Sequence, residues 1–253
     1  MQKISNGIWK ITFGKPEVQT PLNLLNIDIK HNSLNELPIC NNVPLNEENI
    51  NFRLERRGCV LEIPMKTTED IYGFGLQLYS INQSGKKKYI RVNSDPVADT
   101  GDSHAPVPFY VSSAGYGVYV DTARYASFYC GTNAKKGISK NKVEKRKEHK
   151  EFSENALYAI KKANEDRSVI IDIPSVEGVD IYIFAGPDIK TVVQRYNLFS
   201  GGGCMPPIWG LGVWYRSYGG SVEADVYRLA EEFRNTEMPV DVFGLERGWH
   251  SHS

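Results

Sequence analysis

Polar side chains follow two apolar runs near the C-terminal end of the sequence. Arg216 and Tyr218 come after the run of residues 208–214, and Glu246 directly follows the run of residues 240–245. An acidic residue just past a buried strand has no structural need, which favours a functional role for Glu246. A carboxylate accepts two hydroxyl protons at once, so this pattern indicates hydrogen bonding to a hydroxylated ligand. For Arg216 a second interpretation stays open, an ion pair with an acidic neighbour.

An earlier segment holds a second group of candidates. Asp95 stands in the sequence Asn-Ser-Asp-Pro, whose residue types form turns by themselves, so a site role and a plain turn both stay open. Asp99, Asp102 and His104 share the same loop and are weaker candidates.

Other site chemistries find little support. His250 and His252 stand two apart near the chain end, a pattern more typical of exposed, unligated histidines, so no metal is predicted. Gly73 and Gly75 are not part of a GxGxxG nucleotide loop, and no cofactor is implied. The basic run of residues 135–150 contains interleaved glutamates and lacks aromatic residues, which favours a solvated loop over an anion-binding patch.

Composition argues against several classes of partner. The 253 residues carry 30 basic and 30 acidic side chains, a balance that disfavours nucleic acid and anionic membrane surfaces. No apolar run approaches the length of a membrane span. The 14 tyrosines and 4 tryptophans suit β-sheet, and flat rings also suit sugar binding, although core packing accounts for most of them.

The cysteine spacing predicts neither a zinc site nor a dense disulfide framework. Cys40, Cys59, Cys130 and Cys204 lie far apart and contain no CxxC pair. Free thiols are expected, with one long-range disulfide open if the protein is exported. The N-terminal residues do not form a signal peptide. The compartment stays open between the cytoplasm and export from a bacterial cell.

Short strand patterns broken by turns fill residues 4–184. Many short strands at this spacing predict a β-sandwich. The clearest patterns cover residues 8–13, 59–63, 88–92, 108–112, 117–120, 168–173 and 179–184.

A helix follows the last of these strands. Gly186-Pro187-Asp188 is predicted to open it, and the glycines of residues 201–203 to end it. Its apolar positions are at close to helical spacing. They are Ile189, Val192, Val193, Tyr196 and Phe199.

The remaining residues predict a strand, a helix and a second strand. Residues 208–214 predict a buried strand, with Trp209 and Trp214 in the core. Ser221 is the predicted N-cap of a helix with an apolar stripe, and residues 240–245 predict the next strand. This order is typical of a parallel β-α-β unit.

Two parallel strands need further strands or a partner to bury both faces. We therefore expect the chain to be truncated, with a sandwich in residues 1–185, a linking helix and glycine-rich connection in residues 186–204, and the start of an α/β domain in residues 205–253. The last segment is expected to be disordered, packed on the sandwich or buried in a contact between copies, which leaves a homo-oligomer open.

Five motifs, in order, resemble family 31 of the glycoside hydrolases. Each motif is weak alone, and five in register over nearly the whole chain are specific. They are Tyr72-Gly73-Phe74-Gly75-Leu76-Gln77, with Gln77 where the family often has Glu; Arg91 to Asp95 followed by Val107 to Ser113 and Gly115 to Asp121; Gly186-Pro187-Asp188; Met205-Pro206-Pro207-Ile208-Trp209-Gly210-Leu211-Gly212; and Pro239-Val240-Asp241-Val242.

The resemblance implies a fold and an activity. The fold is mainly β, a galactose-mutarotase-like N-terminal β-sandwich followed by the first β-α-β of an incomplete (β/α)8 barrel. The activity is that of a retaining α-glycosidase on an α-linked glycoside, with two carboxyl groups acting in a double displacement. The family carries both catalytic aspartates on later barrel strands and loops, so the chain as given is expected to be inactive.

The resemblance also assigns candidate sugar-binding residues. Glu246 stands where the family usually has an Asp that hydrogen-bonds the sugar hydroxyls, and the longer arm leaves the sugar identity open. Arg247 and Trp249 follow on the same loop, where Trp249 could stack on a pyranose. Arg216 and Tyr218 point toward the same pocket, and Asp95 matches a loop position that reaches over the barrel mouth. The rival interpretation is a non-catalytic sandwich that binds glycans or mediates assembly.

Overall fold

The computed structural model describes residues 1–93, 98–132 and 167–246. The chain divides into two compact units, a first unit of residues 1–202 and a second unit of residues 203–253. Asp95, Arg247 and Trp249, the basic run of residues 135–150 and the two C-terminal histidines lie outside the described residues.

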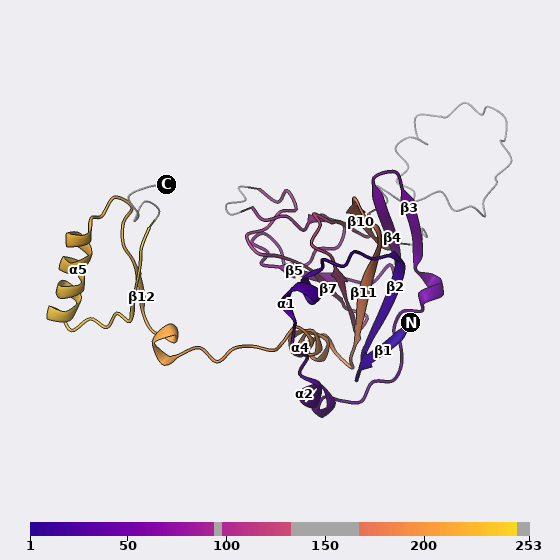
Figure 1. Ribbon diagram of the computed structural model, residues 1–253, viewed down its shortest axis with the longest axis horizontal. Coiled ribbons are helices and arrows are strands. Elements are labelled where there is room, and N and C mark those ends of the chain that lie inside the picture. The colour runs from indigo at the N-terminus through magenta and orange to yellow at the C-terminus, as the bar shows by residue number, and fades with distance from the viewer. Residues whose placement is uncertain (94–97, 133–166, 247–253) are drawn as a thin grey trace. The chain divides into compact units, whose positions relative to one another are not determined.

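The first unit contains two antiparallel sheets (Figure 1). One has six strands in the order β1-β2-β11-β8-β7-β5 and the other has five in the order β3-β4-β10-β9-β6. The mainly β fold is thus confirmed. The six-stranded sheet comprises β1 (Gln2–Ser5), β2 (Ile8–Lys15), β11 (Glu177–Ala185), β8 (Tyr116–Asp121), β7 (Pro106–Ser112) and β5 (Ile71–Gly75). The five-stranded sheet comprises β3 (Asn51–Glu55), β4 (Gly58–Met65), β10 (Arg167–Pro174), β9 (Ser127–Cys130) and β6 (Lys87–Tyr89).

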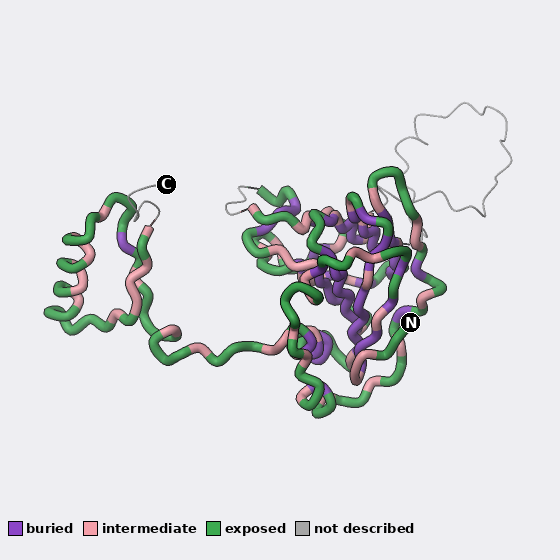
Figure 2. Tube along the Cα trace, in the orientation of Figure 1, coloured by how far each residue is buried: buried purple, intermediate pink, exposed green. Residues whose placement is uncertain are grey.

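Alternating side chains of both sheets form the core between them. Val179, Ile181 and Ile183 of β11 point into the same apolar cluster as Val169 and Ile171 of β10. Successive side chains on a strand point to opposite faces, so the other face of β11 also needs cover. Figure 2 shows the buried residues concentrated in the strands of this unit.

Helix α4 (Ile189–Phe199) covers the outer face of the six-stranded sheet. Its N-cap is Asp188, the last residue of the triplet predicted to open the helix, and the Asp188 carboxylate accepts a hydrogen bond of 2.7 Å from the backbone N–H of Thr191. Tyr196 stacks on Phe109 of β7 with ring centroids 3.8 Å apart, and Phe199 packs near Tyr182 of β11. Two short helices, α1 (Pro21–Leu25) and α2 (His31–Glu36), and a 3-10 turn of Glu47–Asn49 lie in the connection between β2 and β3.

One predicted strand is shorter in the structure than its sequence pattern. The predicted strand of residues 88–92 ends at Tyr89, and Val92 is exposed and forms only an isolated bridge to Ser103. The run is apolar at alternate positions, but beyond Tyr89 no strand of the five-stranded sheet continues beside it in the described residues. Strands β1, β3, β5 and β9 were absent from the sequence prediction.

The second unit contains a strand, a helix and a strand in the predicted order. Strand β12 (Trp214–Arg216) and strand β13 (Val242–Gly244) pair in parallel and are joined by α5 (Glu223–Asn235). The parallel unit is therefore present, and its extension into a barrel stays a prediction.

The predicted buried strand of residues 208–214 is wrong. Ile208–Leu211 form a 3-10 turn after the two prolines, closed by a hydrogen bond of 2.9 Å from the Gly210 N–H to the Pro207 carbonyl. The side chains of Trp209 and Trp214 are 56% and 59% exposed. Two strands and one helix provide cover for one sheet face only, so the described part of this unit cannot bury these indoles.

Helix α5 begins one residue later than predicted. Its N-cap is Val222 rather than Ser221, and the carboxylate of Asp225 accepts a hydrogen bond of 3.1 Å from the Val222 N–H. The Ser221 N–H instead donates to the Tyr218 carbonyl in the preceding turn. An acidic residue in the first turn satisfies a free backbone donor and thereby fixes the start of the helix.

The glycines of the Tyr72-to-Gln77 motif have a structural cause. Gly73, Phe74 and Gly75 all have positive φ angles, at a bulge where the pairing of β5 with β7 shifts register. The bulge turns the Phe74 ring into the core, where it lies 5.1 Å from the Phe128 ring. A Cβ at Gly75 would lie 2.0 Å from the Ala105 carbonyl oxygen.

We predict that Gly75→Ala destabilises the first unit far more than Gly85→Ala. Both glycines have a positive φ, so each substitution costs about 1 kcal/mol of backbone strain, but a Cβ at Gly85 meets nothing within 4 Å. The clash at Gly75 raises its total cost to roughly 3 kcal/mol or more. Urea unfolding of the two variants measures the difference in their free energies of unfolding. Equal losses of stability would contradict the close contact expected at Gly75.

A buried guanidinium holds α4 to the sheet. Arg195 has no exposed surface, and it donates to three backbone carbonyls, those of Asn6 at 3.1 Å, Ala185 and Pro38. No carboxylate accepts from it among the described residues. Burial lowers the pKa of the guanidinium from its ordinary value.

We predict that Arg195→Met lowers the free energy of unfolding by about 3–5 kcal/mol, because three carbonyls then lose their donor inside the protein. Arg56→Met, at an exposed arginine in the β3–β4 turn, is the matched control and leaves the unfolding midpoint unchanged. A midpoint for Arg195→Met equal to that of the control would show that the three carbonyls are satisfied without it.

Candidate functional site

Parallel pairing brings the ends of β12 and β13 to one edge. Arg216 is in register with Gly244, and the Ser217 N–H donates to the Gly244 carbonyl at 2.9 Å. The Ser217 hydroxyl donates to the same carbonyl at 3.1 Å. Both strands run in the same direction, so the residues that follow each of them lie beside one another.

Hydrogen bonds and ring contacts before the strand ends hold this parallel pair together. The Asp241 carboxylate accepts a hydrogen bond of 2.8 Å from the Val213 N–H, and the Asp241 N–H donates to the Val213 carbonyl at 2.9 Å. The rings of Tyr215, Phe233 and Phe243 pack with centroids 4.9 to 5.8 Å apart and hold α5 against the strands. These contacts set the spacing of the strand ends.

The candidate residues form an ion pair at this edge. The guanidinium of Arg216 contacts the carboxylate of Glu246, and their side chains are 81% and 23% exposed. The acidic-neighbour interpretation of Arg216 is thus present in the structure, and the neighbour is itself a candidate residue. An exposed pair of this kind adds little to stability.

A hollow of about 420 Å³ lies beside this pair. It is lined by Arg216, Ser217, Tyr218, Gly219 and Glu246, and the Tyr218 ring is largely exposed. The lining offers a carboxylate, a guanidinium, a hydroxyl and a phenol, a set that both donates and accepts hydrogen bonds. Such a surface can bind a small ligand with several hydroxyl groups.

The weaker candidates of the first unit are engaged elsewhere. Asp99 accepts from Lys86 at 2.6 Å and lies 3.5 Å from the ammonium of Lys88, and the hydrogen bond from Lys86 lowers the pKa of the Asp99 carboxyl. Asp102 is buried and accepts from the guanidinium of Arg91 at 2.5 Å. Both carboxylates therefore stabilise their own loop through ion pairs.

Sequence reasoning missed Ser217. This residue is the one buried position among the described residues of the second unit, and it belongs to the lining of the hollow, while its hydroxyl donates to the Gly244 carbonyl. The signal available was its position in the sequence, between the candidates Arg216 and Tyr218. Within the described ranges no group of three or more His, Cys, Asp or Glu could hold a metal, and no helix is long and apolar enough to cross a membrane.

Comparison with known proteins adds sequence relatives. The chain is 26% identical to the alpha-xylosidase XylQ of Lactiplantibacillus pentosus over 192 residues, which is 74% of this chain and 21% of that protein. It is 42% identical to the lysosomal alpha-glucosidase of Mus musculus over 64 residues, 25% of this chain and 7% of that protein. No protein-family model matches the sequence. The chain spans about a fifth of the length of the relatives that it matches over most of its own residues.

Solved structures share the fold. A family 31 dextranase of Flavobacterium johnsoniae complexed with glucose aligns with a TM-score of 0.59 and 20% identity, over 81% of this chain and 21% of that one. A xylosidase from Aspergillus niger aligns with a TM-score of 0.56 and 19% identity, over 81% of this chain and 24% of that one.

Fold and sequence similarity together point to the glycoside hydrolases as the class of protein that this chain resembles. The resemblance found in the motifs is confirmed: the chain is similar in sequence to alpha-xylosidases and shares the fold of the N-terminal portion of family 31 enzymes.

Proposed function

We propose that the protein to which this chain belongs is a retaining α-glycosidase acting on α-linked glycosides, and that Glu246 binds hydroxyls of the sugar. The observation that carries the proposal is the meeting of Glu246, Arg216 and Tyr218 in one hollow at the carboxyl ends of two parallel strands. In α/β barrels, sites form at this end of the strands.

The names of the relatives support the same chemistry. They include alpha-xylosidases and alpha-glucosidases, and one solved neighbour is complexed with glucose and another with xylose. Xyloside, glucoside and galactoside substrates all remain in the proposal.

The ion pair assigns a role to each partner. The guanidinium of Arg216 contacts the Glu246 carboxylate, a group that only accepts hydrogen bonds. Arg216 contacts Oε1 of Glu246, and no described residue donates to Oε2, which can accept from sugar hydroxyls. Arg216 therefore positions the carboxylate.

The chemical steps belong to groups outside this chain. A retaining enzyme uses one carboxylate as nucleophile and a second carboxyl group as acid and then base. In the family both stand on later barrel strands, so residues 1–253 alone are predicted to bind sugar weakly and to turn over no glycoside.

The complete gene product should cleave at least one nitrophenyl α-glycoside from a panel of xyloside, glucoside and galactoside, with retention of anomeric configuration observed by proton NMR. Residues 1–253, expressed alone, should cleave none. If the complete product is inactive on the whole panel, or inverts the anomeric centre, the proposal fails and the alternative of a non-catalytic glycan-binding or assembly module gains support.

In the active protein, Glu246→Gln should lower kcat/KM by roughly 10²-fold or more, because hydrogen bonds of sugar hydroxyls to a charged acceptor are lost. Arg216→Met should have a smaller effect, carried mainly by a higher KM. Glu231→Gln, on the exposed face of α5, is the control and leaves both constants unchanged. A normal kcat/KM for Glu246→Gln would remove this residue from the site.

A further inference from the structure

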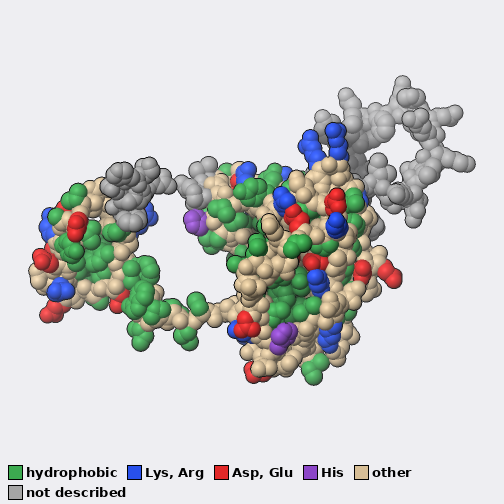
Figure 3. All heavy atoms as spheres, viewed as in Figure 1, with side chains coloured by type: hydrophobic (Ala, Val, Ile, Leu, Met, Phe, Trp, Pro, Cys, Tyr) green, Lys and Arg blue, Asp and Glu red, His purple; other side chains and the backbone are tan. Residues whose placement is uncertain are grey.

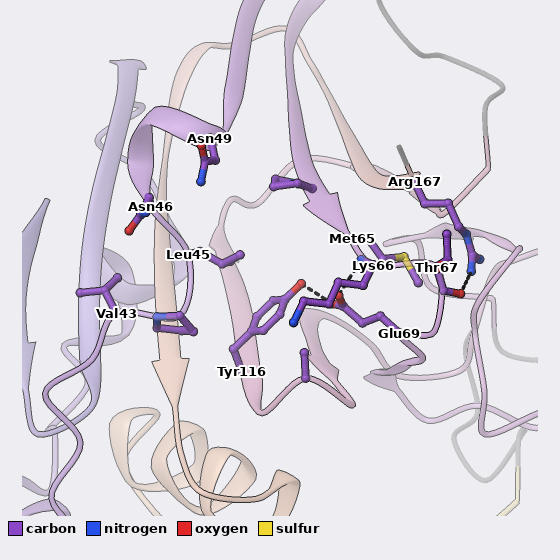
Figure 4. A pocket seen from close by; sticks show the side chains of 13 residues that line it. Val43, Leu45, Asn46, Asn49, Met65, Lys66, Thr67, Glu69, Tyr116 and Arg167 are labelled. Carbon is purple, nitrogen blue, oxygen red and sulfur yellow. Dashed lines mark hydrogen bonds between the residues drawn. The ribbon is translucent and has the colours of Figure 1, made fainter. Parts of the chain in front are cut away.

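The first unit contains a second polar hollow, far along the sequence from the strand ends described above. It has a volume of about 850 Å³ and lies between the segment before β3, the end of β4 and the starts of β8 and β10 (Figure 4). Pockets of this size accommodate ligands as large as short oligosaccharides.

A buried carboxylate lies in the hollow. Glu69 is 4% exposed, and its Oε1 accepts hydrogen bonds of 2.5 Å from the Ser112 hydroxyl and from the Tyr116 phenol. Its Oε2 accepts one hydrogen bond of 2.9 Å from the Lys66 N–H. A carboxylate has about four acceptor positions, so three donors leave one position on Oε2 for a ligand.

The donors that hold Glu69 are themselves fixed. Tyr116 is buried on β8, and burial together with the nearby Glu69 charge raises the pKa of its phenol well above the ordinary value. The phenol therefore remains a hydrogen-bond donor over the whole physiological range. Ser112 is fully buried at the end of β7. The geometry of the carboxylate is thus set before any ligand arrives.

The rim supplies free polar groups. The ammonium of Lys66 is exposed and has no side-chain partner among the described residues, and Figure 4 shows the side chain reaching toward Tyr116. The exposed amides of Asn46 and Asn49 stand on the opposite segment. An ammonium donates only, whereas an amide both donates and accepts.

The same hollow has apolar walls. Leu45 and Met65 are buried in it, and Val43 is half-buried. A ligand that fits must therefore present hydroxyl groups on its edges and C–H groups on its faces. The lining carries both signs of charge, Glu69 against Lys66 and Arg167, and the Arg167 guanidinium donates to the Thr67 carbonyl at 2.9 Å. Uncharged hydroxyl groups can donate to the carboxylate and accept from the cations, which favours a neutral ligand.

We propose that this hollow binds a short uncharged oligosaccharide, with a sugar hydroxyl donating to Glu69 and the Lys66 ammonium donating to a ring or hydroxyl oxygen. The site lies wholly in the first unit and does not depend on the assignment of Glu246.

The probe is isomaltotriose, titrated at millimolar concentration into residues 1–253 and followed by amide chemical shifts. The amides of Lys66, Thr67 and Glu69 should shift in a saturable manner. Lys66→Met should weaken the affinity about tenfold, which corresponds to about 1.4 kcal/mol and is modest for a charged hydrogen bond. Because Lys66 is exposed and holds Glu69 through its backbone, the variant should fold normally.

Two controls distinguish this site from the hollow at Glu246. Lys15→Met, at an exposed lysine on β2, leaves the affinity unchanged, and Glu246→Gln leaves the Lys66 and Glu69 shifts unchanged. No saturable shift at these amides with isomaltotriose, maltotriose or xylotriose would overturn the proposal, as would shifts produced by inorganic phosphate in place of the sugars. Neither result bears on the glycosidase assay of the complete protein.

Discussion

The packing of helix α4 on the six-stranded sheet depends on one buried guanidinium, that of Arg195. Arg195 joins the β1–β2 turn at Asn6, the end of β11 at Ala185 and the segment after α2 at Pro38. The space it needs is provided by Gly7, where a Cβ would lie 2.6 Å from its Nε. A buried cation is tolerated only when its donors are used, and here backbone carbonyls take the place of a carboxylate. The helix can therefore bury Phe199 and Val192 against the outer face.

The two units differ in how far they bury their own apolar groups. The first has a core between its sheets and a second cluster under α4. In the described part of the second, Ser217 alone is buried, and Figure 3 shows hydrophobic side chains gathered on its surface. Exposed apolar surface of this kind marks a contact with other structure. This is the physical basis for expecting that the second unit completes its fold with further chain or with a partner.

The two proposed sugar contacts use one chemical arrangement. In each, a carboxylate is held by neighbours that leave an acceptor position open, Glu246 by Arg216 and Glu69 by Tyr116 and Ser112. They differ in burial, since Glu69 is 4% exposed and accepts from residues of two strands, whereas the Glu246 side chain is 23% exposed at the end of a half-buried strand. The more buried carboxylate has the more fixed geometry, and Glu246 requires further structure around it to bind a sugar tightly.

The sequence by itself determined the β-rich class, the opening of a helix at residues 186–188, the strand–helix–strand order and the family resemblance, because alternation, helix-start signals and glycine-rich turns act over a few neighbouring residues. It also predicted Glu246 and Arg216 as neighbouring candidates. Only the tertiary structure showed that residues 208–211 form an exposed turn and that Glu69 lies buried in a hollow. The same holds for Arg195, whose partners Asn6 and Pro38 stand 189 and 157 residues away. Whether a polar side chain is buried and satisfied depends on such distant groups, which no local pattern encodes.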